Sequence, residues 1–106
     1  MGNVTLLTKD NFENFIQAPL AIVDFWAPWC GPCRALAPTL DKVAQEQNVL
    51  IGKMSIEDED SQNFVQKYQV RSIPTLLFFK HGLCVESHVG TISEQDLIEK
   101  INTHAK

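Results

Sequence analysis

Residues 20–26, with the sequence L-A-I-V-D-F-W, constrain the fold of this chain more than any other segment. Six of the seven side chains are apolar, and such a short, near-continuous apolar run is typical of a β-strand buried on both faces. A strand of this kind lies inside a sheet that helices cover on both sides, as in α/β proteins. The segment therefore predicts a central strand around which the rest of the chain is arranged.

Four helices are predicted from apolar side chains that recur at helical spacing. The first is expected to follow an N-cap at Thr8, the second to begin at Cys30, and the last to follow Ser93, where acidic residues favour a helix start. The third follows the acidic run 57–60, which we interpret as a solvated helix N-terminus. The apolar stripes are Phe12, Phe15 and Ile16; Leu36, Leu40, Val43 and Ala44; Phe64, Val65 and Tyr68; and Leu97, Ile98 and Ile101.

Further strands are predicted from other apolar runs. Residues 49–56 form a second buried strand, and a strand before the first helix is optional. Residues 75–79 and 83–89 form two more, separated by His81-Gly82, a loop typical of a hairpin whose turn needs positive φ. Alternating strands and helices imply parallel strands with right-handed crossovers, and the hairpin adds antiparallel ones. The predicted fold class is α/β, with a mixed central sheet and helices on both faces.

Cys30 and Cys33 lie three positions apart within W-A-P-W-C-G-P-C-R, residues 26–34. A structural zinc site usually needs four Cys or His ligands, but Cys84 stands alone and the three histidines form no recognisable ligand pair. Three cysteines are also too few for a disulfide scaffold. The pattern therefore favours a redox couple over a metal site or a structural disulfide.

The redox interpretation depends on a helix that begins near Cys30. Unpaired backbone N–H groups and the positive end of the helix dipole favour a thiolate there, which makes Cys30 the attacking nucleophile. Cys33 lies one turn further, within reach for a disulfide. Pro32 is tolerated in a first helical turn, and Gly31 leaves the sulfurs open to a protein substrate.

Asp24 interrupts the apolar strand, where its carboxyl is expected to be buried. Burial raises the pKa of a carboxyl. Asp24 lies on the strand that leads to the cysteines, so its carboxyl could take the proton of the Cys33 thiol in the resolving step. The alternative is that Asp24 lies at a bulge or a sheet edge, where its carboxyl is exposed to solvent. Lys53 is predicted either to turn inward as the partner of Asp24 or to extend its ammonium to solvent.

Charge and hydropathy narrow the class of partner. A net charge of −4 argues against a basic nucleic-acid surface, and no apolar run approaches the roughly 18 residues of a membrane span. Residues 1–12 lack the pattern of a signal peptide. We expect one domain, residues 1–106, in the cytoplasm, with no nucleic-acid or membrane partner.

The chain also resembles the thioredoxin family. The motifs that carry the resemblance are the nonapeptide 26–34, V-D-F-W at 23–26, R-S-I-P-T at 71–75, F-K-H-G at 79–82 and V-G at 89–90. The resemblance implies the thioredoxin fold, a five-stranded mixed sheet flanked by four helices. It also implies a thiol-disulfide oxidoreductase that reduces disulfides in target proteins, recharged by thioredoxin reductase with electrons from NADPH.

The same resemblance implies roles for single residues. Cys30 corresponds to the nucleophile and Cys33 to the resolving cysteine. Asp24 and Lys53 correspond to a buried acid and its lysine neighbour. The Trp26 side chain is expected to be partly buried and to have a packing role. No bound cofactor or metal is implied, and the chain is expected to act as a monomer in electron transport and cell redox homeostasis. The active-site loop implied by the resemblance contains Trp29, Gly31 and Pro32. The implied substrate-binding residues are Trp29, Ile73, Pro74 and Gly90, and the peptide bond between Ile73 and Pro74 is expected to be cis.

Two functional alternatives stay open. The couple could instead act as a disulfide oxidase or isomerase, although Gly31-Pro32 and the lack of a signal peptide favour reduction. The fold could also serve as an adaptor for one partner. Cys84 is predicted on the more polar face of its strand, with Glu86 and His88, as a half-buried small side chain; a modifiable thiol is the alternative.

Overall fold

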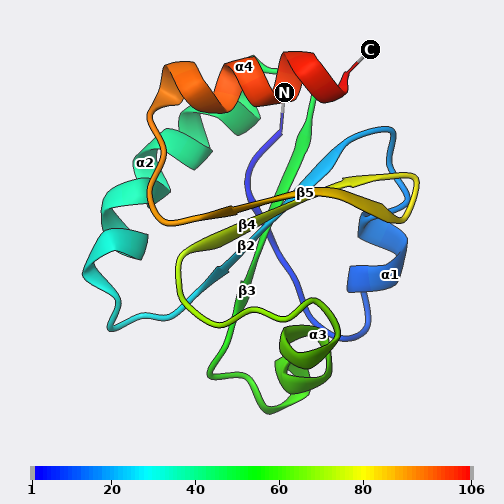
Figure 1. Ribbon diagram of the computed structural model, residues 1–106, viewed down its shortest axis with the longest axis vertical. Helices are drawn as coiled ribbons and strands as arrows, with labels where there is room; N and C mark the ends of the chain where they lie inside the picture. The colour runs from blue at the N-terminus through cyan, green and yellow to red at the C-terminus, as the bar shows by residue number, and fades with distance from the viewer. Residues whose placement is uncertain (1, 106) are drawn as a thin grey trace.

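The computed structural model describes residues 2–105, in which a twisted central sheet lies between two layers of helices (Figure 1). In these residues the sheet has five strands in the order β1-β3-β2-β4-β5. β2 pairs with β3 in parallel and with β4 antiparallel, so the sheet is mixed. The predicted fold class is confirmed. The strands are β1 Thr5–Leu6, β2 Ala21–Trp26, β3 Leu50–Ser55, β4 Thr75–Lys80 and β5 Leu83–Val89.

The helices cover the sheet on both faces. The long helices α2 and α4 pack on one face around Ile22, Leu76 and Phe78, and the short helices α1 and α3 lie on the other (Figure 1). None of the helices in residues 2–105 is long and apolar enough to cross a membrane. The bounds are α1 Phe12–Phe15, α2 Gly31–Glu46, α3 Gln62–Lys67, which follows the 3₁₀ turn η1 Glu59–Ser61, and α4 Glu94–His104.

Strand β2 is the centre of the sheet, as the apolar run predicts. Its first five side chains are buried, and Asp24 is among them. Asp24 lies in register with Lys53 on β3 and with Leu76 on β4. An acid is therefore enclosed by paired strands instead of lying at a wet edge.

The prediction that Thr8 caps the first helix is wrong. The helix begins at Phe12, and Asn11 occupies the N-cap position. Thr8 instead starts the turn before it, because its backbone N–H donates to Asn11 Oδ1 at 2.7 Å and its side chain accepts from the N–H of Asp10 at 3.2 Å. The Ser93 cap of α4 does form, and its side chain accepts from the N–H of Asp96.

The hairpin between β4 and β5 forms at the predicted loop, with φ of 49° at His81 and 89° at Gly82. The face predicted for Cys84 is wrong. Phe79 pairs with Cys84 but Phe78 pairs with Glu86, so Val85 is an extra residue in β5. Such a bulge reverses the alternation of side chains. Cys84 therefore lies on the sheet face opposite to Glu86, and it is exposed.

Glu86 connects β5 to the last turns of α4. Its carboxylate pairs with the Lys100 ammonium and, at 2.6 Å, with Nε2 of His104. These two groups hold the pKa of Glu86 below its usual range. The side chain of His104 is only 17% exposed. It is enclosed because its ring also packs on Phe78.

Candidate active site

The two cysteines of the motif lie where β2 gives way to α2. Cys30 is the N-cap of α2 in an extended conformation, with Pro32 in the first turn and Cys33 one turn along, 5.2 Å away between Cα atoms. The two form a disulfide. The backbone N–H of Cys33 points at Cys30 Sγ, 3.2 Å away. A helix N-terminus thus presents a donor to the first sulfur, and this is the environment that stabilises a thiolate.

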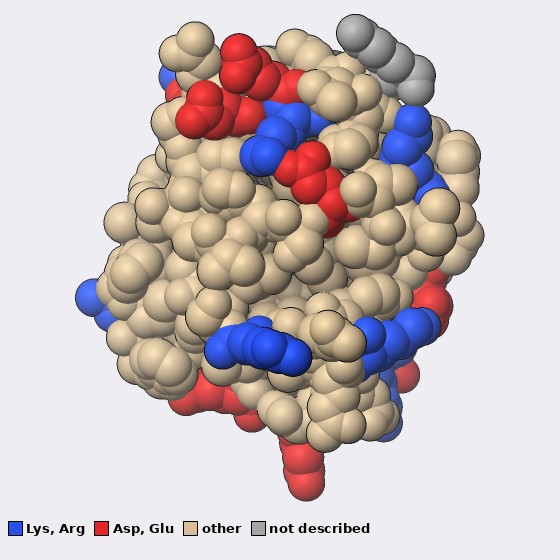
Figure 2. All heavy atoms as spheres, in the orientation of Figure 1, with Lys and Arg blue, Asp and Glu red and all other residues tan. Residues whose placement is uncertain are grey.

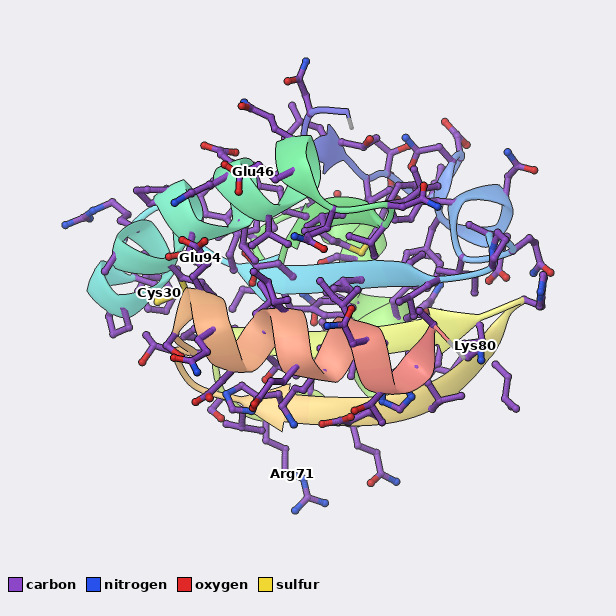
Figure 3. All side chains as sticks on the ribbon, turned by 90° about the horizontal axis from the view of Figure 1, so that it is seen from above. Cys30, Glu46, Arg71, Lys80 and Glu94 are labelled. Carbon is purple, nitrogen blue, oxygen red and sulfur yellow. A yellow bond between two sulfur atoms is a disulfide. The ribbon has the colours of Figure 1, made fainter. Side chains whose placement is uncertain are left out.

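The disulfide is at one end of the sheet. Cys30 and Lys80 lie at opposite ends of the molecule when it is viewed from above (Figure 3). Both sulfur-bearing residues are nearly enclosed, with Cys30 5% and Cys33 3% exposed. The two residues therefore expose little of their surface at that end of the molecule.

The loop before β4 lies against the disulfide. The peptide bond between Ile73 and Pro74 is cis, and the Ile73 carbonyl oxygen is 4.0 Å from Cys30 Sγ. Gly90, at the end of β5, donates its N–H to the Pro74 carbonyl at 2.8 Å and has a φ of 98°. The four residues come from three distant parts of the sequence, and the fold places them at one point.

Trp29 extends from the loop between β2 and α2, and it is 64% exposed. Its indole N–H donates to Glu57 Oε2 at 2.7 Å. Trp29, Ile56, Val70 and Ile73 are among the residues that line an open groove of about 300 Å³. Glu57 was not predicted as a site residue, because the acidic run has the ordinary explanation of a helix N-terminus and no local pattern relates it to a tryptophan 28 positions away.

Charged side chains leave part of the surrounding surface free. On the face that carries β5, acidic and basic groups gather over α4 and around α3, and uncharged side chains fill the zone between them (Figure 2). Gly31 is exposed beside the disulfide.

Asp24 lies in the interior, on the strand that leads to the disulfide. It is 3% exposed, and its Oδ1 atom has no hydrogen-bond partner among the described residues. Burial raises the pKa of Asp24 to about 7, and the charge of Lys53 opposes part of that rise. A cavity of about 170 Å³ is lined by Asp24 and Cys33, among others. The carboxyl is thus a base of near-neutral pKa on the same cavity as the second sulfur.

Lys53 turns toward this cavity and is half-buried. Its ammonium lies 4.5 Å from the centroid of the Trp26 ring. It forms no ion pair with Asp24 among those of residues 2–105. Sequence reasoning offered Asp24 or solvent as the two destinations of the ammonium, and the aromatic ring is a third that it missed.

The site has the groups for thiol-disulfide exchange. The two cysteines form a disulfide, a buried carboxyl shares a cavity with Cys33, and the Ile73 carbonyl lies next to Cys30 Sγ. A pair of cysteines that can form and break a disulfide is the group that this exchange requires. No group of three or more His, Cys, Asp or Glu side chains in residues 2–105 is arranged to hold a metal ion.

Comparisons with known proteins agree on one family. The family model described as Thioredoxin matches residues 3–103. Curated thioredoxins from Chlamydia caviae and Chlamydia pneumoniae are 42% and 46% identical over 103 residues, which is 96% of this chain and 99% of each relative. The solved structure of a mutant thioredoxin from Halobacterium salinarum aligns with a TM-score of 0.88 at 27% identity, over 97% of this chain and 90% of that one. A Malassezia sympodialis thioredoxin aligns with a TM-score of 0.83 at 31% identity, over 100% and 94%.

Proposed function

The chain belongs to the thioredoxin family, and from that membership we propose that it reduces disulfides in target proteins and is recharged by thioredoxin reductase with electrons from NADPH. Its relatives identify it as a thiol-disulfide oxidoreductase with protein-disulfide reductase activity. The observation that carries the assignment of residues is the Cys30–Cys33 disulfide at the N-terminus of α2, on the same cavity as the buried carboxyl of Asp24.

The first step forms a mixed disulfide. In the reduced protein the Cys30 thiolate attacks one sulfur of the target disulfide, that bond breaks, and the other target sulfur leaves as a thiolate that takes a proton from water. The N–H of Cys33, which is directed at Cys30 Sγ in the disulfide form, supports this assignment, since it would stabilise negative charge on that sulfur.

The second step releases the target. Asp24 takes the thiol proton of Cys33, whose sulfur then attacks Cys30 and expels the second target sulfur as a thiolate. The target gains two electrons and the dithiol becomes the disulfide. A base whose pKa is about 7, as that of Asp24 is, suits this transfer because it can accept a proton and later return it at neutral pH. The positive charge of Lys53 lowers the pKa of Asp24 and so offsets part of the rise caused by burial.

Target binding uses the surface around the sulfurs. An extended target segment pairs with the backbone of Ile73, next to Pro74 and Gly90, as a short added strand. Trp29 and the groove beside it receive an apolar side chain of the target. Gly31 and Pro32 are exposed next to the nearly enclosed sulfurs, and they form the rim that the target meets. The protein acts as a monomer of one domain, residues 1–106, in cytoplasmic electron transport and redox homeostasis.

NADPH consumption tests this proposal directly. Wild-type protein and Cys30→Ser are each mixed with thioredoxin reductase, NADPH and insulin. Rapid oxidation of NADPH by the wild type and none by the variant is the expected result. Wild-type protein that dithiothreitol reduces but no reductase recharges would overturn the proposed electron source. A reduction potential of the Cys30–Cys33 couple near that of a disulfide oxidase would overturn the proposal that the protein reduces its targets.

A further inference from the structure

Lys53 shares the cavity beside the disulfide with Asp24 and Trp26, and in the part of the chain that the structure describes its ammonium contacts the ring and forms no ion pair with the carboxyl. Its ammonium lies over the Trp26 ring, 4.5 Å from the centroid. Asp24 Oδ1, on the same cavity, has no hydrogen-bond partner among the described residues. A buried carboxylate oxygen without a partner is a strong attractor for a cation. The position of the ammonium therefore calls for a physical cause.

The arrangement follows from strand geometry. Asp24 and Trp26 are two positions apart on β2, so their side chains leave the same face of the sheet. Lys53 lies in register with Asp24 on the parallel strand β3, and its side chain is on that face too. The flexible stem of a lysine can reach either neighbour. The electron-rich face of an indole is the best of the aromatic partners for such a charge.

We propose that Trp26 is a positioning residue, whose ring holds the Lys53 ammonium and keeps it out of direct contact with the Asp24 carboxylate. The inference rests on the proposed function, in which Asp24 takes the proton of Cys33. An ammonium in contact with a carboxylate weakens its hold on a proton. With the ammonium on the ring, Asp24 keeps the proton affinity that transfer from a thiol requires.

The other charged or titratable groups near Asp24 come from α2. Cys33, Arg34 and Asp41 line the same cavity, and Leu76, the register neighbour on β4, is neutral. Cys33 does not titrate in the disulfide form, and the other two side chains stay the same in every variant below. The oxidised protein therefore isolates the contest between the ring and the carboxylate.

The test is a titration of the Asp24 carboxyl carbon by NMR in oxidised wild type, Trp26→Leu and Trp26→Phe. In Trp26→Leu the ammonium loses the ring and moves to Oδ1, so the pKa of Asp24 falls by at least about 0.5. In Trp26→Phe a ring remains, and the pKa stays within about 0.2 of the wild-type value. Both variants shorten the side chain and remove the indole N–H, so they form a matched pair. Trp26→Met replaces Trp26→Leu if that variant does not fold.

A second background separates the ammonium from water that enters the vacated space. When Lys53→Met is added to both variants, the Leu and Phe proteins are expected to titrate alike. Equal titration of the two with Lys53 in place would overturn the proposal. A difference that persists without Lys53, or a rise in the pKa of Asp24 in Trp26→Leu, would also overturn it.

Turnover links the contact to the reaction. In the insulin assay, the pH at which Trp26→Leu reaches half its maximal rate is expected to fall by the same amount as the pKa of Asp24. A loss of rate that is equal at every pH would show a merely structural role and overturn the proposal. An inactive wild type would instead refute the proposed function, and the titration of the disulfide form would still report on the ring and the ammonium.

Discussion

Asp24→Asn is expected to stabilise the protein against unfolding, by an amount that grows with pH. The carboxyl is 3% exposed and Oδ1 has no partner among the described residues. Burial raises the pKa of Asp24 from 3.8 to about 7. The folded state thus binds this proton more tightly than the unfolded chain does, and loss of the proton favours unfolding. An amide cannot ionise, so the variant avoids that cost.

The size of the effect follows from the two pKa values. Below 3.8 the carboxyl is protonated in both states, and ionisation costs nothing. From there to about 7, only the unfolded chain loses its proton, so the wild-type free energy of unfolding falls as the pH rises. Each tenfold difference in proton affinity is worth about 1.4 kcal/mol. The full rise in the pKa therefore costs the wild type about 4 kcal/mol above neutral pH.

Guanidinium unfolding of the oxidised proteins measures this cost. Wild type and Asp24→Asn are compared at about pH 4 and about pH 8, where the difference is expected to be near zero and about 4 kcal/mol respectively. Asp10→Asn, the same change at an exposed carboxylate, is the control and is expected to show no such growth.

Two results would refute this reasoning. An equal difference at both pH values would mean that the effect of Asp24 on stability does not come from its charge. A variant less stable than wild type at high pH would mean that the carboxylate has a partner in the folded state that an amide cannot replace.

Three further outcomes are expected. Cys33→Ser accumulates mixed disulfides with target proteins through Cys30, because the second sulfur is gone; mass spectrometry that finds the adducts on Cys84 would contradict the assignment. Glu86→Gln lowers the free energy of unfolding by up to about 1 kcal/mol at neutral pH, and the loss shrinks as the pH falls through the lowered pKa of Glu86, where wild type loses the same charge. Gly90→Ala costs about 1–2 kcal/mol, because its φ of 98° strains an L side chain although space is open around it; an unchanged melting temperature would contradict this.

Local patterns were enough to predict much of the fold. The strand Ala21–Trp26, the helix start at Cys30 and the hairpin at His81-Gly82 each depend on residues within a few positions of one another. The burial of Asp24 could be predicted as well, since apolar neighbours on both sides leave a central strand little alternative. The cis bond before Pro74 was expected only from the family resemblance, because nothing in its local sequence demands it.

Other features depend on contacts that local sequence does not report. Asn11 and Thr8 are both favourable N-cap residues. Thr8 takes part in a turn that ends at Asn11, so the helix begins after Asn11 and not after Thr8. The bulge at Val85 is a property of how β4 and β5 pair, so alternation along β5 alone gives the wrong face for Cys84. The contact of Lys53 with Trp26 likewise needs two strands to be in register.

The bulge in β5 also affects how molecules meet one another. Within residues 2–105, β5 is the last strand of the sheet, so no strand of that part of the chain pairs with the backbone groups along its outer side. A regular edge of this kind is a template on which another chain can add strands and aggregate. The extra residue at Val85 breaks the even spacing of those groups and twists the strand. The irregular edge therefore disfavours edge-to-edge pairing of β5 between molecules, which works against aggregation at high protein concentration.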